Sequence, residues 1–167
     1  RIDVGDISHP DQLMELSTYL DSSNDIALVF SDAEWIDGKN NHMFDSCLPD
    51  DHLFVKWLLN FRNPILHTTV MWRREVVLEK VGKYDEHFRY AQDYKLWSSI
   101  DLSGLSIGHI SKKLIKFRWH NNSVTKQYFK QQVLFVREIS AERIKKCLSD
   151  NTLSDADILR ISSMKDD

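Results

Sequence analysis

The chain of 167 residues has few cysteines, no long apolar run and little net charge, and each of these absences excludes a class of protein. The only two cysteines, Cys47 and Cys147, lie far apart and form no C-x-x-C pair, which argues against a disulfide scaffold or a structural zinc site. No apolar stretch approaches the roughly 20 residues needed to span a bilayer, and no signal-peptide pattern is present. We therefore expect a cytoplasmic protein without a transmembrane segment.

The charges also exclude a strong electrostatic surface. The formal net charge is −3, so we expect no nucleic-acid partner. Basic residues between 126 and 146 are balanced by Glu138 and Glu142, which indicates a solvated helix face. A hydrophobic content of 42% and a charged content of 28% are typical of a globular protein with one core.

Hydrophobic periodicity predicts helices that alternate with strands, and hence an α/β fold with a sheet flanked by helices. Leu13, Leu16 and Leu20 are expected on the buried face of the first helix. The long last helix is expected to bury Phe129, Val133, Val136, Ser140, Ile144 and Cys147. In chain order the expected elements are a helix from 8 to 21, a strand from 26 to 30 that continues towards 36, a turn at 37–41, a helix at 51–61, a strand at 68–72, helices at 74–81 and 90–102, strands at 105–110 and 114–119, and helices from 126 and from 154.

Several segments, in order, resemble the second half of a bacterial family 2 glycosyltransferase domain of GT-A fold. They read R-I-D-V-G-D-I-S-H-P at 1–10, I-A-L-V-F-S-D-A at 26–33, N-P-I-L-H-T-T-V-M-W-R-R at 63–74, A-Q-D-Y-K-L-W at 91–97 and F-R-W-H-N-N-S-V at 117–124. The resemblance implies that residues 1–125 form the acceptor-side half of such a domain, with a mixed sheet. Residues 126–167 would be a helical C-terminal extension packed on it. Because the chain opens inside a motif and without Met, we expect it to be a piece of a longer protein.

The resemblance also implies the chemistry. An inverting enzyme of this family moves a sugar from a nucleotide-diphosphate sugar to a hydroxyl of a glycan or lipid-linked acceptor. Asp93 stands at the position of the base that takes the proton of this hydroxyl, at the amino end of a predicted helix. His67, Trp97 and Gln92 are the acceptor-binding candidates, although an aromatic residue at helical spacing such as Trp97 is more often a core residue, and His67 fits a structural role equally well.

A divalent cation, Mg²⁺ or Mn²⁺, would stabilise the departing diphosphate. Asp3, Asp6 and His120 are the candidate ligands of the metal and of the donor phosphates. Gly5 stands where the family has a further aspartate that ligates the metal, and glycine has no side chain to do so.

Two other hypotheses remain open. The chain would in one case be an inactive fragment or degenerate relative that forms homo-oligomers through an exposed sheet edge. In the other, the stretch from Phe129 to Leu148 would bind a partner protein. In the enzymatic case we expect work in bacterial polysaccharide or glycoconjugate synthesis, with the protein cytoplasmic or peripheral at the membrane.

Overall fold

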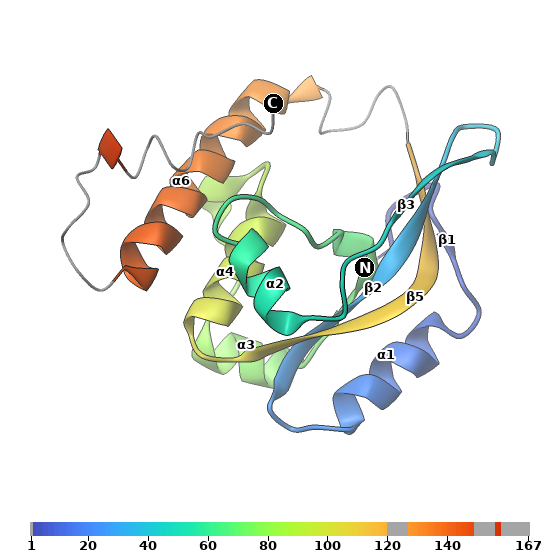
Figure 1. The fold of residues 1–167 in the computed structure, drawn as a ribbon, viewed down its shortest axis with the longest axis horizontal. Helices are drawn as coiled ribbons and strands as arrows, with labels where there is room; N and C mark the ends of the chain where they lie inside the picture. The colour runs from blue at the N-terminus through green and yellow to red at the C-terminus, as the bar shows by residue number, and fades with distance from the viewer. Residues whose placement is uncertain (1, 120–126, 149–155, 158–167) are drawn as a thin grey trace.

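The computed structural model describes residues 2–119, 127–148 and 156–157, and it has the predicted α/β architecture (Figure 1). Two long parallel strands, β2 (Ile26–Ile36) and β5 (Ser106–Arg118), lie at the centre of a mixed sheet. Antiparallel β1 (Ile7–Ser8) pairs with β5, and antiparallel β3 (His42–Ser46) and β4 (Val70–Trp72) pair with opposite ends of β2. This layout is compatible with part of a nucleotide-sugar transferase fold.

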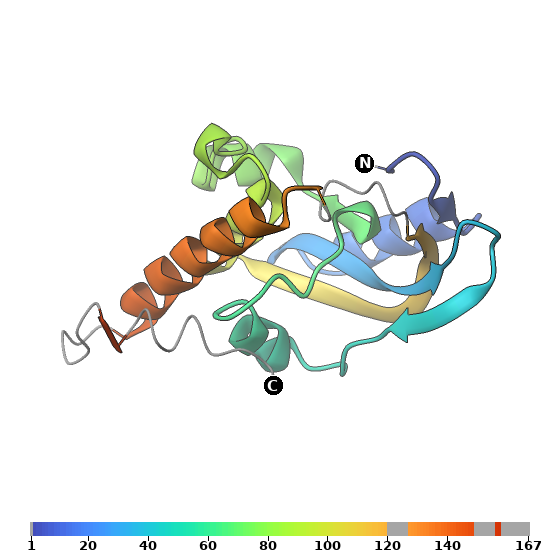
Figure 2. The same cartoon turned by 90° about the horizontal axis from the view of Figure 1, so that it is seen from above.

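Helices cover both faces of the sheet, as Figures 1 and 2 show together. On one face, α1 (Gln12–Asp21) packs through Leu16 and Leu20 against Val29, in a small core cluster. The main core lies on the other face and takes in the neighbours of Val29 in β2, Leu28 and Phe30, because successive strand residues point to opposite faces.

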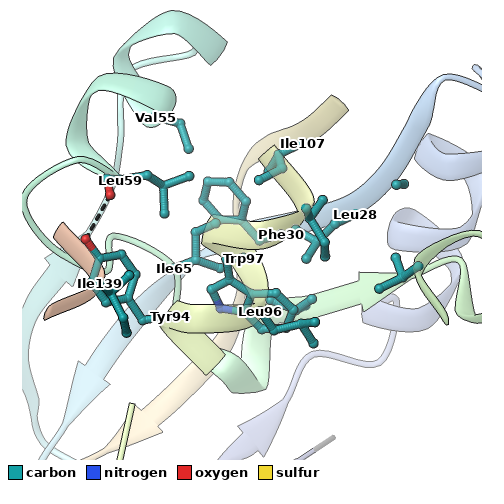
Figure 3. Close-up of a cluster of buried hydrophobic side chains, with 14 of the residues drawn as sticks. Leu28, Phe30, Val55, Leu59, Ile65, Tyr94, Leu96, Trp97, Ile107 and Ile139 are labelled. Carbon is teal, nitrogen blue, oxygen red and sulfur yellow. Dashed lines mark hydrogen bonds between the residues drawn. The ribbon is translucent and has the colours of Figure 1, made fainter. Parts of the chain in front are cut away.

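The main core is built by the helices of the other face, and Figure 3 shows part of it. These helices are α2 (His52–Leu58), α3 (Arg74–Lys80), α4 (Gln92–Leu102) and α6 (Phe129–Cys147). Trp97 of α4 belongs to this core, with 0% of its surface exposed, together with buried residues from β2 and α2. Burial of such large apolar side chains is the main stabilising term of the fold.

The predicted strands needed three corrections. Residues 105–110 and 114–119 do not form two strands but the single strand β5, whose register against β2 shifts on both sides of Asp32. Exposed Ser111 and Lys112 lie at this irregularity, which explains why the apolar pattern is interrupted there. The strand expected from Thr68 begins only at Val70, after the 3₁₀ turn η1 (His67–Thr69). Strand β3 was not predicted, because its residues are mostly exposed and have no buried face.

The expected buried face of the first helix was wrong at one position. Leu13 is 66% exposed, and Gln12 is buried in its place beside Leu16 and Leu20. Gln12 can occupy this site because its Nε2 donates a hydrogen bond to the carbonyl of Thr68 at 3.1 Å. A buried polar residue with a distant partner leaves no apolar signal in the sequence.

The last helix also differs from its predicted face. Its buried residues are Ile139, Ser140, Arg143 and Ile144, whereas Phe129 is 61% exposed and Cys147 is exposed. Figures 1 and 2 place α6 alongside α4, and its central turns make the contacts. The boundary predicted between residues 125 and 126 and most of the helix predicted from Ser154 lie outside the described residues. Within the described part of the chain, no helix combines the length and the apolar composition that a membrane span requires.

Candidate functional site

The predicted acceptor residues converge where the segment from Asn63 to Thr69 crosses the first turns of α4. Helix α4 begins at Gln92, directly after Ala91 and the short 3₁₀ turn η2 (Glu86–Phe88). Helix α2 ends at Leu58, earlier than the predicted end at residue 61, and turns lead from there to Asn63-Pro64. Two segments about 30 residues apart in sequence therefore meet at this place.

Asp93 lies in the first turn of α4 and is half-buried. Its Oδ2 accepts a hydrogen bond from Nδ2 of Asn63 at 3.1 Å, and its Oδ1 accepts one from the backbone N–H of Tyr94 at 2.8 Å. The helix dipole favours a negative charge in this turn. The carboxylate therefore sits in surroundings that favour its ionised form, which a base requires.

Tyr94, the next residue, is buried and anchors the start of α4 through its hydroxyl group. Its hydroxyl donates to the carbonyl of Leu59 at 2.8 Å and lies 3.1 Å from Oγ of Ser140. Burial of the phenol raises the pKa of Tyr94 to about 12. The hydroxyl therefore remains protonated across the physiological range and connects α2 and α6 to the helix that carries Asp93.

The structure brings His67 and Trp97 into contact, but the two side chains differ in exposure. The two rings meet edge to face, with centroids 5.5 Å apart. His67 is half-buried, and its Nε2 lies 2.9 Å from the hydroxyl of Tyr84, which is 38% exposed. His67 and Tyr84 thus form a polar pair near the surface, and Trp97, which His67 contacts, lies one helical turn after Asp93 in α4.

Trp97 does not offer a surface to an acceptor in this structure. Its side chain is 0% exposed and belongs to the main core, so the interpretation as a core residue fits better than the prediction of acceptor contact. Its ring packs against the His67 ring on the side of the core. Gln92 is the first residue of α4 and lies half-buried beside Asp93. Its contact with an acceptor stays a prediction.

Residues 3–6 form a turn that Arg118 holds in place. The backbone N–H of Arg118 donates to Oδ1 of Asp6 at 2.9 Å, and its Nε donates to the carbonyl of Gly5 at 2.8 Å. The same guanidinium donates to the carbonyl of Asp37 and to Oδ1 of Asn40. Arg118 therefore joins this turn to the hairpin turn between β2 and β3.

The described residues do not form a divalent cation site by themselves. Gly5 has a φ of 102°, a conformation that side-chain-bearing residues rarely adopt, so the aspartate of the family pattern would be strained here. Oδ1 of Asp6 is engaged by Arg118. Among residues 2–119, 127–148 and 156–157, no group of three or more metal-ligating side chains could hold an ion. His120 lies outside the described residues, so a cation bound by Asp3, Asp6 and His120 remains a prediction.

Two residues of this region were not singled out from the sequence. Asn63 contacts Asp93, and Tyr84 contacts His67. Asn63 begins the segment at 63–74 that carries the resemblance, but no role was assigned to it. Nothing in the sequence pairs Tyr84 with His67, because that contact depends on how α3 and α4 are joined.

The comparisons with known proteins point to one class of enzyme. No protein-family model matches the chain. Curated relatives that share about 27% identity with most of the chain are named glycosyltransferases, which supports a glycosyltransferase role. They do not favour the hypothesis of an inactive binding module.

Three of these relatives come from distant organisms. An uncharacterized glycosyltransferase of Haemophilus influenzae is 28% identical over 152 residues, which cover 86% of this chain and 47% of the relative. The O-antigen biosynthesis glycosyltransferase WbnJ of Escherichia coli is 27% identical over 148 residues, covering 86% and 57%. The uncharacterized glycosyltransferase MJ1057 of Methanocaldococcus jannaschii is 27% identical over 136 residues, covering 80% and 46%. The chain thus spans about half the length of these curated relatives.

Proposed function

We propose that this chain is the acceptor side of a family 2 glycosyltransferase of GT-A fold, with Asp93 as the catalytic base. The observation that carries the proposal is the half-buried carboxylate of Asp93, fixed by two hydrogen bonds where a loop crosses a helix start. The glycosyltransferase names of the relatives support the same reaction class.

In the proposed reaction, Asp93 takes the proton of an acceptor hydroxyl. The hydroxyl oxygen forms a bond to the anomeric carbon of the donor sugar, and the bond from that carbon to the diphosphate breaks on the opposite face. The nucleoside diphosphate leaves with the bonding electrons, and the configuration at the anomeric carbon is inverted. A bound Mg²⁺ or Mn²⁺ would stabilise the charge on this leaving group. In this proposal His67, whose ring contacts Trp97, orients the acceptor.

We propose a glycan or lipid-linked acceptor, in the synthesis of a bacterial polysaccharide or glycoconjugate. The name of the Escherichia coli relative, which refers to O-antigen biosynthesis, supports this context. The donor would be a nucleotide-diphosphate sugar.

The test is the substitution Asp93→Asn in the full-length protein. Nucleoside diphosphate release is measured with a panel of UDP- and GDP-sugars and membrane lipid extract as acceptor, and UDP binding is measured by calorimetry. Loss of a general base is expected to lower the rate about 100- to 10,000-fold with UDP binding unchanged. The matched control is Asp51→Asn, which also removes a carboxylate that accepts a backbone N–H at a helix start, but on α2. Wild-type rates in the Asp93 variant would refute the assignment.

A further inference from the structure

The side chain of Asn63 donates a hydrogen bond to the Asp93 carboxylate. Its Nδ2 lies 3.1 Å from Oδ2 of Asp93, and both side chains are half-buried. The loop that carries Asn63 is anchored next to it by Ile65, which is 2% exposed in the main core. The amide therefore comes from a fixed part of the backbone rather than from a free loop.

The orientation of the Asn63 amide is determined by its second hydrogen bond. Its Oδ1 accepts the backbone N–H of Ile65 at 3.1 Å, and a backbone N–H can only donate. The oxygen must therefore face Ile65, which leaves the NH₂ group for Asp93. An ionised carboxylate accepts such a hydrogen bond more strongly than a protonated one, so the amide favours the charged form of Asp93.

Both oxygens of the carboxylate are engaged by donors. Oδ1 accepts from the Tyr94 N–H and Oδ2 accepts from Asn63. Two donors on two different oxygens fix the rotation of the carboxylate about its last bond. Because the backbone of Tyr94 belongs to α4, the Asn63 amide is the component of this arrangement that comes from outside the helix.

We propose that Asn63 is a positioning residue that holds the Asp93 carboxylate in the orientation and charge state required to accept the proton of the acceptor hydroxyl. This inference rests on the proposed function and adds a residue to it. Asn63 does not contact the substrate in this proposal. It acts through Asp93 only.

The test compares Asn63→Ala with a matched amide, Asn60→Ala, in the full-length protein. Asn60 is also half-buried, and its amide bonds to the Lys56 carbonyl and to Arg143 rather than to Asp93. Both substitutions remove a hydrogen-bonded asparagine, so both are expected to lower the melting temperature. Only the Asn63 variant is expected to change the chemistry of the base.

For Asn63→Ala we expect kcat to fall about 10- to 100-fold while KM for the acceptor extract stays within about twofold, since a misplaced catalytic group affects the chemical step more than binding. The acidic limb of the pH–rate profile should move to higher pH, because a lost donor makes the charged carboxylate less favourable. Asn60→Ala should leave both properties unchanged per folded molecule.

The outcomes separate this inference from the proposed function. An active Asp93→Asn variant would overturn both. An inactive Asp93→Asn variant, together with wild-type kcat and an unmoved acidic limb in Asn63→Ala, would overturn only the role of Asn63. The role of Asn63 would also be overturned if Asn63→Ala and Asn60→Ala lost the same rate, and if that loss equalled the loss of folded protein.

Discussion

Arg143 anchors helix α6 to the domain, and its replacement by Met is expected to cause a large loss of stability. The Arg143 side chain is 1% exposed, and its Nη2 lies 2.7 Å from Oδ2 of Asp101, which is 8% exposed. Its Nη1 also donates to the carbonyl and to Oγ of Ser98. A single buried guanidinium therefore connects the C-terminal half of α6 to the last turns of α4.

The magnitude follows from what remains after the substitution. Methionine occupies much of the volume of the arginine stem, so the cavity contribution is small. Asp101 would keep one cationic neighbour, Lys56, at 3.4 Å and on a side chain that is 44% exposed. Removing one partner of a buried ion pair costs about 3–5 kcal/mol. Because domains of this size have only about 5–15 kcal/mol of stability, the variant should be severely destabilised.

The assay is urea unfolding, followed by tryptophan fluorescence and by far-UV circular dichroism. We expect Arg143→Met to lose about 3 kcal/mol, and the exposed neighbour Lys146→Met to stay within about 0.5 kcal/mol of wild type. Adding Asp101→Asn to Arg143→Met should recover part of the loss, because the unpaired charge is then removed. Equal stability of the Arg143 and Lys146 variants would refute the reasoning and would favour an α6 that is only loosely attached.

Two further predictions concern Gly5 and Tyr94. Gly5→Asp would restore the family pattern but force a residue with a side chain into a φ of 102°. We therefore expect a loss of stability of about 1–3 kcal/mol, measured by thermal unfolding. We expect no gain in Mn²⁺ binding by calorimetry, and tighter binding would contradict this. Tyr94 has a pKa of about 12 in the folded protein and near 10 when unfolded, so the folded state alone keeps this proton between those values. Stability from Tyr94 is therefore fully present below pH 10 and is lost as pH rises towards 12, by roughly 2–3 kcal/mol. The measurement is urea unfolding of wild type and Tyr94→Phe from pH 8 to pH 11. The difference in stability between the two proteins should shrink above pH 10. A constant difference would show that the phenol does not titrate in this way.

Local patterns predicted the elements whose signals lie within a few residues. A helix was expected over residues 74–81, and α3 spans Arg74–Lys80; Gly82 follows it with a φ of 100°, and its N–H donates to the carbonyl of Val77. Helix α4 was expected close to its observed bounds, with Asp93 near its start. Such features depend on backbone conformation and helix periodicity, which neighbouring residues determine.

Features that depend on a distant partner were not predictable in the same way. Gln12 is buried because the carbonyl of Thr68 accepts its hydrogen bond, and Arg143 is buried because Asp101 compensates its charge. Both residue types are ordinarily exposed, so a polar–apolar pattern places them at the surface. Strand β3 is held mainly by its pairing with β2 and has no apolar face that could signal it.

The sequence by itself determined that the chain alternates helices and strands, that it resembles a glycosyltransferase, and that Asp93 begins a helix. Only the tertiary structure decided that Asn63 meets Asp93, that His67 lies against Trp97, and that Trp97 is enclosed in the core. The physical reason is that a helix start is a local property, whereas the environment of a carboxylate is made by segments that folding brings together from far along the chain.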